Sequence, residues 1–360
     1  MARIDSFLRL VADQNASDLH FSTGSVPVIR HDGDLLPLPF RVLTATEARR
    51  FLVEILSPEE QKSLERGHEL DFVYALEGVA RFRVNVFLHA RGPAAIFRVI
   101  PKVPASIDEL LLPTVLKKIT EYQNGLVLVC GPTGSGKTTT LAAMIEEVNR
   151  SPTRSRHVVT IEDPIEFIHE PKRSLISQRQ VGLHTESFHA ALRSALRESP
   201  DVIVVGELRD LESISLALAS AETGVLVFGT LHTNSAAKAV DRLIDAFPDD
   251  ARDQARGSIS VLLKAVVAQE LVKRASGEGR IAALEVLLTS TAMANLIREN
   301  KIHQLEAMMY GADGDASGML SLDACLFRYV RDGLVTIEEA MSIAKDPDRL
   351  AKKAQELKED

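Results

Sequence analysis

Residues 126–148 combine a short apolar run, a glycine-rich turn and a helical pattern, and this order constrains the fold more than any other stretch. The apolar run at 126–130 is typical of a buried strand, and the pattern from Lys137 onward is typical of a helix. Between them, residues 131–138 fit the phosphate-binding pattern G-x-x-x-x-G-K-[ST]. Glycines let backbone N–H groups curl around an anion, and the following helix N-terminus adds a favourable dipole. The stretch therefore predicts a phosphate site rather than a turn that binds nothing.

The residue types in this loop indicate separate roles. Lys137 can reach the β- and γ-phosphates of a nucleotide, and the Thr138 hydroxyl can bind Mg²⁺. We expect the nucleotide to be held by the residues of the loop and the first helical turn: Thr133, Gly134, Ser135, Gly136, Lys137, Thr138 and Thr139.

The chain of 360 residues is too long for one ordinary core, so two domains are expected. Helical and strand-like segments in residues 1–100 predict a first α+β domain, and the three prolines within 101–114 predict a linker. Residues 115–360 would then form an α/β domain with a helical C-terminal region.

Strand and helix patterns alternate after the linker, which predicts a parallel sheet covered on both faces. The expected strands are 126–130, 157–161, 201–205 and 225–230. The expected helices between them are 137–149, 187–198 and 210–222. Helical patterns follow at about 235–246, 251–274, 291–300, 318–331 and 336–344, interrupted by a strand at 281–287, and the charged tail 345–360 is expected to be a solvated helix.

Composition excludes several classes of protein. A net charge of −8 disfavours a general nucleic-acid binder. Cys130 and Cys325 are the only cysteines, so neither a C-x-x-C zinc site nor a disulfide framework is expected. No apolar run reaches the roughly 18 residues of a membrane helix and no apolar signal core begins the chain, so a cytoplasmic location is expected.

Acidic residues follow two of the predicted strands. Glu207 follows the strand 201–205, where an acid beside a phosphate loop holds Mg²⁺ through water or orients the attacking water. Glu162 and Asp163 follow the strand 157–161, and clustered carboxylates there can hold Mg²⁺ or activate water. We expect Glu162 and Glu207 to be catalytic, with Thr138, Glu207 and Asp163 as metal ligands.

Two further sets of residues are candidates for contacts with phosphate. His232 follows the strand 225–230, where an imidazole could sense a γ-phosphate, although a lone histidine is more often structural. Arg81, Arg83 and Arg98 lie on strand-like segments of the first domain, and arginine supplied across an interface stabilises a transferring phosphoryl group. Salt-bridged surface arginines are the alternative.

Taken together, these motifs resemble those of the secretion ATPases of the type II and type IV pilus superfamily, and within it the retraction ATPases. The resemblance rests on GPTGSGKTTT (131–140), TIEDPIEF (160–167), ALRESPDVIVVGELRD (195–210) and GTLHTNSA (229–236). The retraction group is further indicated by ASDLH (16–20), ARFRVN (80–85) and ANLIRE (294–299), and by the lack of a four-cysteine element.

This resemblance implies a PAS-like N-terminal domain, a RecA-like ATPase domain with a helical extension, and a hexameric ring of identical subunits. ATP and Mg²⁺ would bind between the two domains, with Arg83 and Arg98 as clamps and Arg81 behind them. Glu207 would be the Walker B glutamate, and His232 would belong to the family's His box, although Val225 stands where relatives often carry a second histidine. Glu162 and Asp163 would belong to its Asp box. Hydrolysis would drive an inner-membrane pilus platform protein from the cytoplasmic face of the membrane.

Other functions remain open from the sequence. The chain could be an accessory motor that depends on a second retraction ATPase, a RecA-like nucleic-acid motor, or a ring subunit that binds ATP without turnover.

Overall fold

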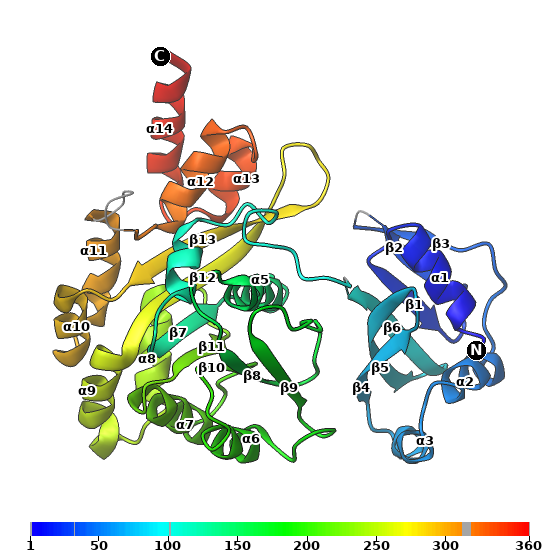
Figure 1. Cartoon of the computed structure of the whole chain (residues 1–360). Helices are drawn as coiled ribbons and strands as arrows, with labels where there is room; N and C mark the ends of the chain where they lie inside the picture. Colours follow the sequence, from blue (N-terminus) through cyan, green and yellow to red (C-terminus); the bar gives the residue numbers. More distant parts are fainter. Residues whose placement is uncertain (1, 32, 101, 312–317, 360) are drawn as a thin grey trace. The chain divides into compact units, whose positions relative to one another are not determined.

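The computed structural model describes residues 2–31, 33–100, 102–311 and 318–359, and Figure 1 shows the order of their helices and strands. They form two compact units. The first is built from the chain up to Val103 together with Pro164–Ile168, and the second from Pro104–Asp163 and the chain from His169 onward. The short segment Pro164–Ile168 therefore interrupts the second unit, a crossing that the sequence patterns did not indicate.

The first unit contains a six-stranded sheet in the order β3-β2-β1-β6-β5-β4, with every neighbouring pair antiparallel. Its strands are β1 (Asp18–Ser22), β2 (Val28–His31), β3 (Asp34–Pro37), β4 (Leu70–Leu76), β5 (Ala80–His89) and β6 (Gly92–Ile100). Its helices are α1 (Asp5–Asp13), α2 (Ala45–Val53) and α3 (Pro58–Glu65). This is the α+β unit that was expected, and its PAS-like classification stays a prediction.

Alternation along β5 separates the core of this unit from an arginine-bearing face. Phe82 and Val84 are fully buried among apolar residues of the three helices, so the residues between them point to the other face of the sheet. Arg81 and Arg83 lie there, and Arg98 is the cross-strand partner of Arg83 on β6. The sheet register thus brings all three arginines to one face.

The second unit contains a seven-stranded sheet in the order β13-β12-β7-β11-β10-β8-β9. Every pairing is parallel except that of β12 with β13. Its strands are β7 (Gly125–Cys130), β8 (His157–Glu162), β9 (Leu175–Gln180), β10 (Val202–Val205), β11 (Leu226–Leu231), β12 (Leu263–Lys273) and β13 (Arg280–Leu288). The predicted parallel sheet is confirmed.

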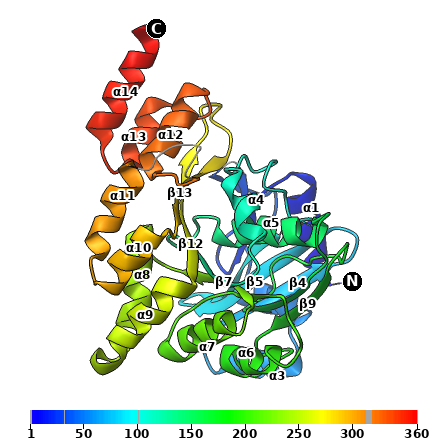
Figure 2. The ribbon, with the colours of Figure 1, turned by 60° about the vertical axis from the view of Figure 1, so that its left-hand side comes forward.

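Helices cover both faces of this sheet, and in Figure 2 α6 and α7 lie on the opposite side from α4 and α5. One face carries α6 (Phe188–Ala195), α7 (Leu211–Glu222), α8 (Ala236–Asp245), α9 (Arg252–Leu262), α10 (Thr291–Arg298) and α11 (Leu305–Gly311). The other carries α4 (Val115–Thr120), α5 (Lys137–Arg150), α12 (Leu322–Arg331), α13 (Ile337–Ile343) and α14 (Pro347–Glu359).

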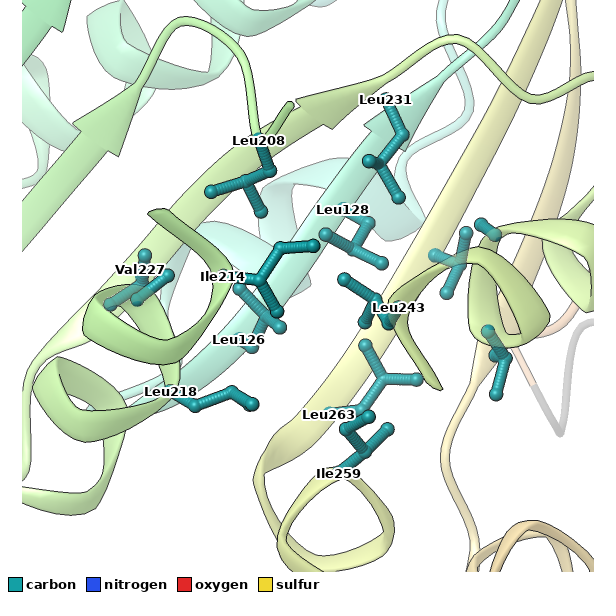
Figure 3. Close-up of a cluster of buried hydrophobic side chains, with 14 of the residues drawn as sticks. Leu126, Leu128, Leu208, Ile214, Leu218, Val227, Leu231, Leu243, Ile259 and Leu263 are labelled. Carbon is teal, nitrogen blue, oxygen red and sulfur yellow. The ribbon is translucent and has the colours of Figure 1, made fainter. Parts of the chain in front are cut away.

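The central strand β7 contributes to both cores. Leu126 and Leu128 point to the first face, where Figure 3 shows them among apolar side chains of α7, α8 and α9. Val127 and Val129 point to the second face. Because β7 is buried on both sides, its carboxyl end is held firmly, and the phosphate loop begins there.

Two expectations from the sequence need correction. The segment 251–274, expected to be one helix, is helix α9 followed by strand β12. Strand β12 is buried on both faces between β7 and β13, which removes the alternation that distinguishes a strand from a helix. The tail helix α14 is not wholly solvated, because Leu350 is 2% exposed and packs in the core beside α12.

Within the described part of the chain, no helix is both long and apolar enough to span a membrane.

Candidate functional site

The glycine-rich loop joins β7 to α5 with the backbone that the sequence predicts. Gly131, Gly134 and Gly136 have φ angles of 151°, 80° and 86°, in the region that favours glycine. Gly136 is the N-cap of α5 and supplies no side chain to cap it. The first N–H groups of α5 therefore remain available to an anion.

Lys137 spans this loop. Its side chain is largely buried, and its Nζ donates to the carbonyls of Gly131 and Pro132 at 2.8 and 2.9 Å. Burial lowers the pKa of Lys137 from its ordinary value, and the nearby Glu207 carboxylate acts in the opposite direction. The ammonium group thus lies against the backbone of the loop, and a bound phosphate would offer it stronger acceptors than carbonyls.

Ser135 provides a second sign that the loop is built for an anion. Its hydroxyl is buried, and among the described residues it has no hydrogen-bond partner. A buried polar group without a partner is costly, so it points to a ligand that supplies the missing acceptor. The exposed side chains of Thr133 and Thr138 flank this position, as does Thr139 at the start of α5.

Three of the predicted catalytic residues lie at the carboxyl ends of neighbouring strands. Glu162 ends β8, Glu207 follows β10 and His232 follows β11, and the sheet order places these strands in succession beside β7. Carboxyl ends of adjacent parallel strands lie at one edge, where ligands bind in open α/β sheets. The structure therefore brings these three residues to the same edge as the phosphate loop.

Side-chain bonds orient the two glutamates. Glu207 Oε1 lies 3.3 Å from His232 Nε2, and its Oε2 lies 2.7 Å from Arg209 Nε. Glu162 Oε1 accepts hydrogen bonds from Thr160 Oγ1 at 2.6 Å and from Gln178 Nε2 at 3.1 Å. Glu207 keeps one fifth of its side chain exposed, so solvent can reach it.

Two hydrogen bonds of the Gly206 backbone connect the three strand ends. The Gly206 N–H donates to the carbonyl of Ile161 at 2.8 Å, and the Gly206 carbonyl accepts from the Thr230 hydroxyl. A Cβ at Gly206 would lie 3.1 Å from the Ile161 carbonyl oxygen, which explains a glycine before Glu207. The spacing between the catalytic candidates is thus set by the sheet rather than by mobile loops.

The expected metal ligands provide only part of a coordination sphere. Asp163 and Thr138 are exposed and Glu207 is partly exposed, so all three can offer oxygen atoms, which Mg²⁺ prefers. The described residues contain no group of three or more His, Cys, Asp or Glu side chains that could hold a metal ion. The set therefore fits a Mg²⁺ that takes its remaining ligands from nucleotide phosphates and water.

The three candidate arginines of the first unit already have hydrogen-bond or ion-pair partners within that unit. Arg81 donates to the carbonyls of Ile165 and Glu166 at 3.0 and 2.8 Å, in the segment that joins this unit. Arg83 pairs with Asp71 at 2.7 Å and with Glu166 at 2.9 Å. The hydrogen bond to Asp71 raises the pKa of Arg83, opposed by burial.

Arg98 pairs with Asp18, which is its cross-strand neighbour and is almost fully buried, at 2.9 Å. A phosphate that contacts Arg83 or Arg98 would therefore share the guanidinium with these carboxylates or replace them.

Several residues that complete the site were missed by sequence reasoning. Thr160, Gln178, Arg209 and Gln269 contact the loop or the glutamates from other parts of the chain. Thr160 and Arg209 lie inside motifs quoted above but were given no role there, whereas Gln178 and Gln269 lie in no motif.

The fold and this edge of the sheet define the class of the protein, a nucleotide-binding fold built around a phosphate loop. Within this class, the chain belongs to the type II/IV secretion system protein family, whose model matches residues 2–356.

Individual relatives support the resemblance to retraction ATPases. The chain is 47% identical over 347 residues to the type IV pilus retraction ATPase PilT of Pseudomonas aeruginosa, covering 96% of this chain and 99% of that one. It is 37% identical over 340 residues to the type IV pilus ATPase PilU of the same organism, covering 94% and 88%. The crystal structure of the pilus retraction motor PilT with bound ADP matches with a TM-score of 0.87 at 39% identity, over 98% of this chain and 99% of that one.

Proposed function

We propose that the protein is an ATPase motor that powers retraction of type IV pili. The observation that carries this proposal is the phosphate loop with Glu162, Glu207 and His232 at one sheet edge, in a chain 47% identical to a retraction ATPase over nearly its whole length. The ADP in the matching PilT structure supports a nucleotide in this loop.

The residues of the site would have separate roles in hydrolysis. The N–H groups of the loop and Lys137 bind the phosphates, with Thr138 directed to Mg²⁺, which would spread the negative charge that develops on them. Glu207 holds the attacking water and accepts its proton, and His232 keeps the carboxylate oriented. Glu162, fixed by Thr160 and Gln178, positions the water or the ion from the neighbouring strand.

The arginines of the first unit are proposed to reach the nucleotide during the cycle. Arg83 and Arg98 would exchange their carboxylate partners for phosphate oxygens, while Arg81 stays bonded to the backbone of Ile165 and Glu166. Such an exchange would link the state of the nucleotide to movement of one unit against the other.

We further propose a homohexameric ring at the cytoplasmic face of the inner membrane, acting on the membrane platform protein of the pilus. An accessory motor that depends on a second retraction ATPase is the alternative. Greater identity to PilT than to PilU, 47% against 37%, favours the primary motor.

Deletion of the gene tests the proposal, with complementation by wild type, Lys137→Ala and Glu207→Gln. We expect abundant pili and no twitching in the deletion strain and in both variant strains. Bald cells would instead indicate an assembly motor, and normal motility would indicate an accessory role.

Purified protein separates the remaining alternatives. We expect ATP hydrolysis that DNA and RNA do not stimulate; stimulation by either would favour a nucleic-acid motor, and nucleotide binding without turnover would indicate a scaffold.

A further inference from the structure

Gln269 lies where strand β12 runs past the end of β7. The parallel pairing of these strands ends with Ala268 opposite Cys130, so Gln269 stands directly beside the start of the phosphate loop. Its side chain is buried, with 2% of the residue exposed. A polar amide at such a position needs partners, and it finds them in the loop.

Both ends of the Gln269 amide are bonded across the loop. Its Nε2 donates to the carbonyl of Ser135 at 2.6 Å, and its Oε1 accepts from the Thr140 hydroxyl at 2.7 Å. The first bond reaches the loop itself and the second reaches the first turn of α5. Glutamine suits this position because its amide is both donor and acceptor, whereas a carboxylate cannot donate.

The loop is also packed tightly against this residue. A Cβ on Gly136 would lie 2.9 Å from Gln269 Nε2, and a Cβ on Gly131 would collide with the Gln269 carbonyl oxygen. The close approach of Gln269 thus adds to the positive φ angles as a reason for glycine at these two positions.

The bond to Ser135 fixes the direction of the next N–H group. A trans peptide is planar, with its carbonyl and N–H pointing in opposite directions. When the Ser135 carbonyl points to Gln269, the N–H of Gly136 must point away from Gln269. This N–H is one of those that the phosphate-binding pattern uses.

We infer that Gln269 is a positioning residue for nucleotide binding: its amide holds the Ser135–Gly136 peptide in the orientation that presents the Gly136 N–H to phosphate. The inference rests on the proposed nucleotide site in the loop. Because Gln269 is buried and both ends of its amide are bonded to protein, its proposed effect is on the preorganisation of the loop before binding.

The test is nucleotide affinity of the full-length Gln269→Glu variant, measured by fluorescence titration with a labelled ADP in excess Mg²⁺. Glutamate keeps the size and can still accept from Thr140, but its ionised form repels the Ser135 carbonyl. We expect the Kd to rise at least tenfold. The ADP-induced rise in Tm should shrink accordingly, because stabilisation by a ligand follows its affinity. Thr140→Val, which removes only the second bond, should weaken ADP binding by a smaller factor.

Asn149→Ala is the matched control. Asn149 is a fully buried amide on α5, the helix that carries Thr140, and it is bonded to the backbone of Glu170 and Lys172 away from the loop. We expect it to lower the Tm of the apo protein but to leave the Kd within twofold of wild type. A residue with a merely structural role would behave the same way, so an equal pattern for Gln269→Glu would overturn the inference.

Wild type and Lys137→Ala separate this inference from the proposed function. If wild type fails to bind ADP, the nucleotide site is wrong. If wild type binds ADP and Lys137→Ala does not, while Gln269→Glu and Thr140→Val bind within twofold of wild type, only the role of Gln269 is refuted. If Gln269→Glu does not fold, Thr140→Val decides: unchanged affinity refutes the inference, and weakened affinity supports it.

Discussion

His232 Nε2 lies 3.3 Å from Glu207 Oε1, so the histidine after β11 contacts the carboxylate after β10. Arg209 holds the other oxygen of the same carboxylate. The glutamate is thus oriented from two sides, and this arrangement makes the roles of Glu207 and His232 separable by mutation.

Replacement of Glu207 by glutamine should abolish turnover while nucleotide stays bound. The amide keeps the shape but cannot accept a proton, and loss of a general base costs typically 10²- to 10⁴-fold in rate. We expect kcat to fall at least 100-fold, with the Kd for ADP within a few-fold of wild type. Glu212→Gln, an exposed change on α7, is the control and should leave both unchanged. Normal turnover in Glu207→Gln would remove this residue from the mechanism.

Replacement of His232 by alanine should slow hydrolysis less than replacement of Glu207. The imidazole orients the carboxylate, while Arg209 still holds the other oxygen, so we expect about a tenfold loss of kcat. In the double variant with Glu207→Gln, the two losses should not multiply, because residues that act as a unit are non-additive. Steady-state ATPase assays of the two single variants and the double variant measure this; fully multiplicative losses would show that His232 acts independently.

Alanine substitutions at Arg298 and Ile297 should separate force transmission from folding. Both residues lie on α10, in the ANLIRE stretch (294–299) that resembles the retraction group. Ile297 is fully buried, whereas Arg298 is exposed. We expect Arg298→Ala to keep ATPase activity within twofold of wild type but to abolish twitching. Ile297→Ala should cost about 2–5 kcal/mol of stability and reduce both activities. Equal loss of hydrolysis and motility in Arg298→Ala would make α10 a structural helix only.

His169 should make stability depend on pH. Its side chain is 2% exposed and lies 3.7 Å from buried Glu146, and burial lowers its pKa to about 4. The unfolded chain, with a pKa near 6.5, takes up a proton first on acidification, so stability is retained above about pH 6.5 and lost as the pH falls toward 4.

Between pH 7.5 and pH 5 this amounts to about 2 kcal/mol from this group. Urea unfolding of wild type and His169→Leu at both pH values measures it, since the other titrating groups are common to the two proteins. If the two proteins lost the same free energy of unfolding on acidification, folding would not lower the pKa of His169, and the prediction would be wrong.

Local patterns in the sequence determined the phosphate loop and its strand–helix setting. Glycine spacing predicts the conformation at Gly131 and Gly136, and apolar runs with acidic ends predict that Glu162 and Glu207 lie at, or just after, the ends of their strands. These features depend on neighbours within one strand, turn or helix, so they can be read without knowledge of the rest of the chain.

Whether the segment Leu263–Lys273 forms a strand or a helix was decided by its burial in the sheet. Its sequence fits a helix or a strand, and only its place between β7 and β13 makes it a strand. That choice brings Gln269 to the loop, across a separation of 134 residues from Ser135.

The ion-pair partners of Arg83 and Arg98 were also decided by the tertiary structure. Asp18 meets Arg98 because of the register of β1 with β6, and Glu166 meets Arg83 because the segment Pro164–Ile168 joins the first unit. The sequence alone thus indicated which residues to propose for binding and hydrolysis of a nucleotide. Only the tertiary structure decided which side chains hold them in place, because hydrogen bonds and ion pairs between distant segments exist only after the sheets have set their register.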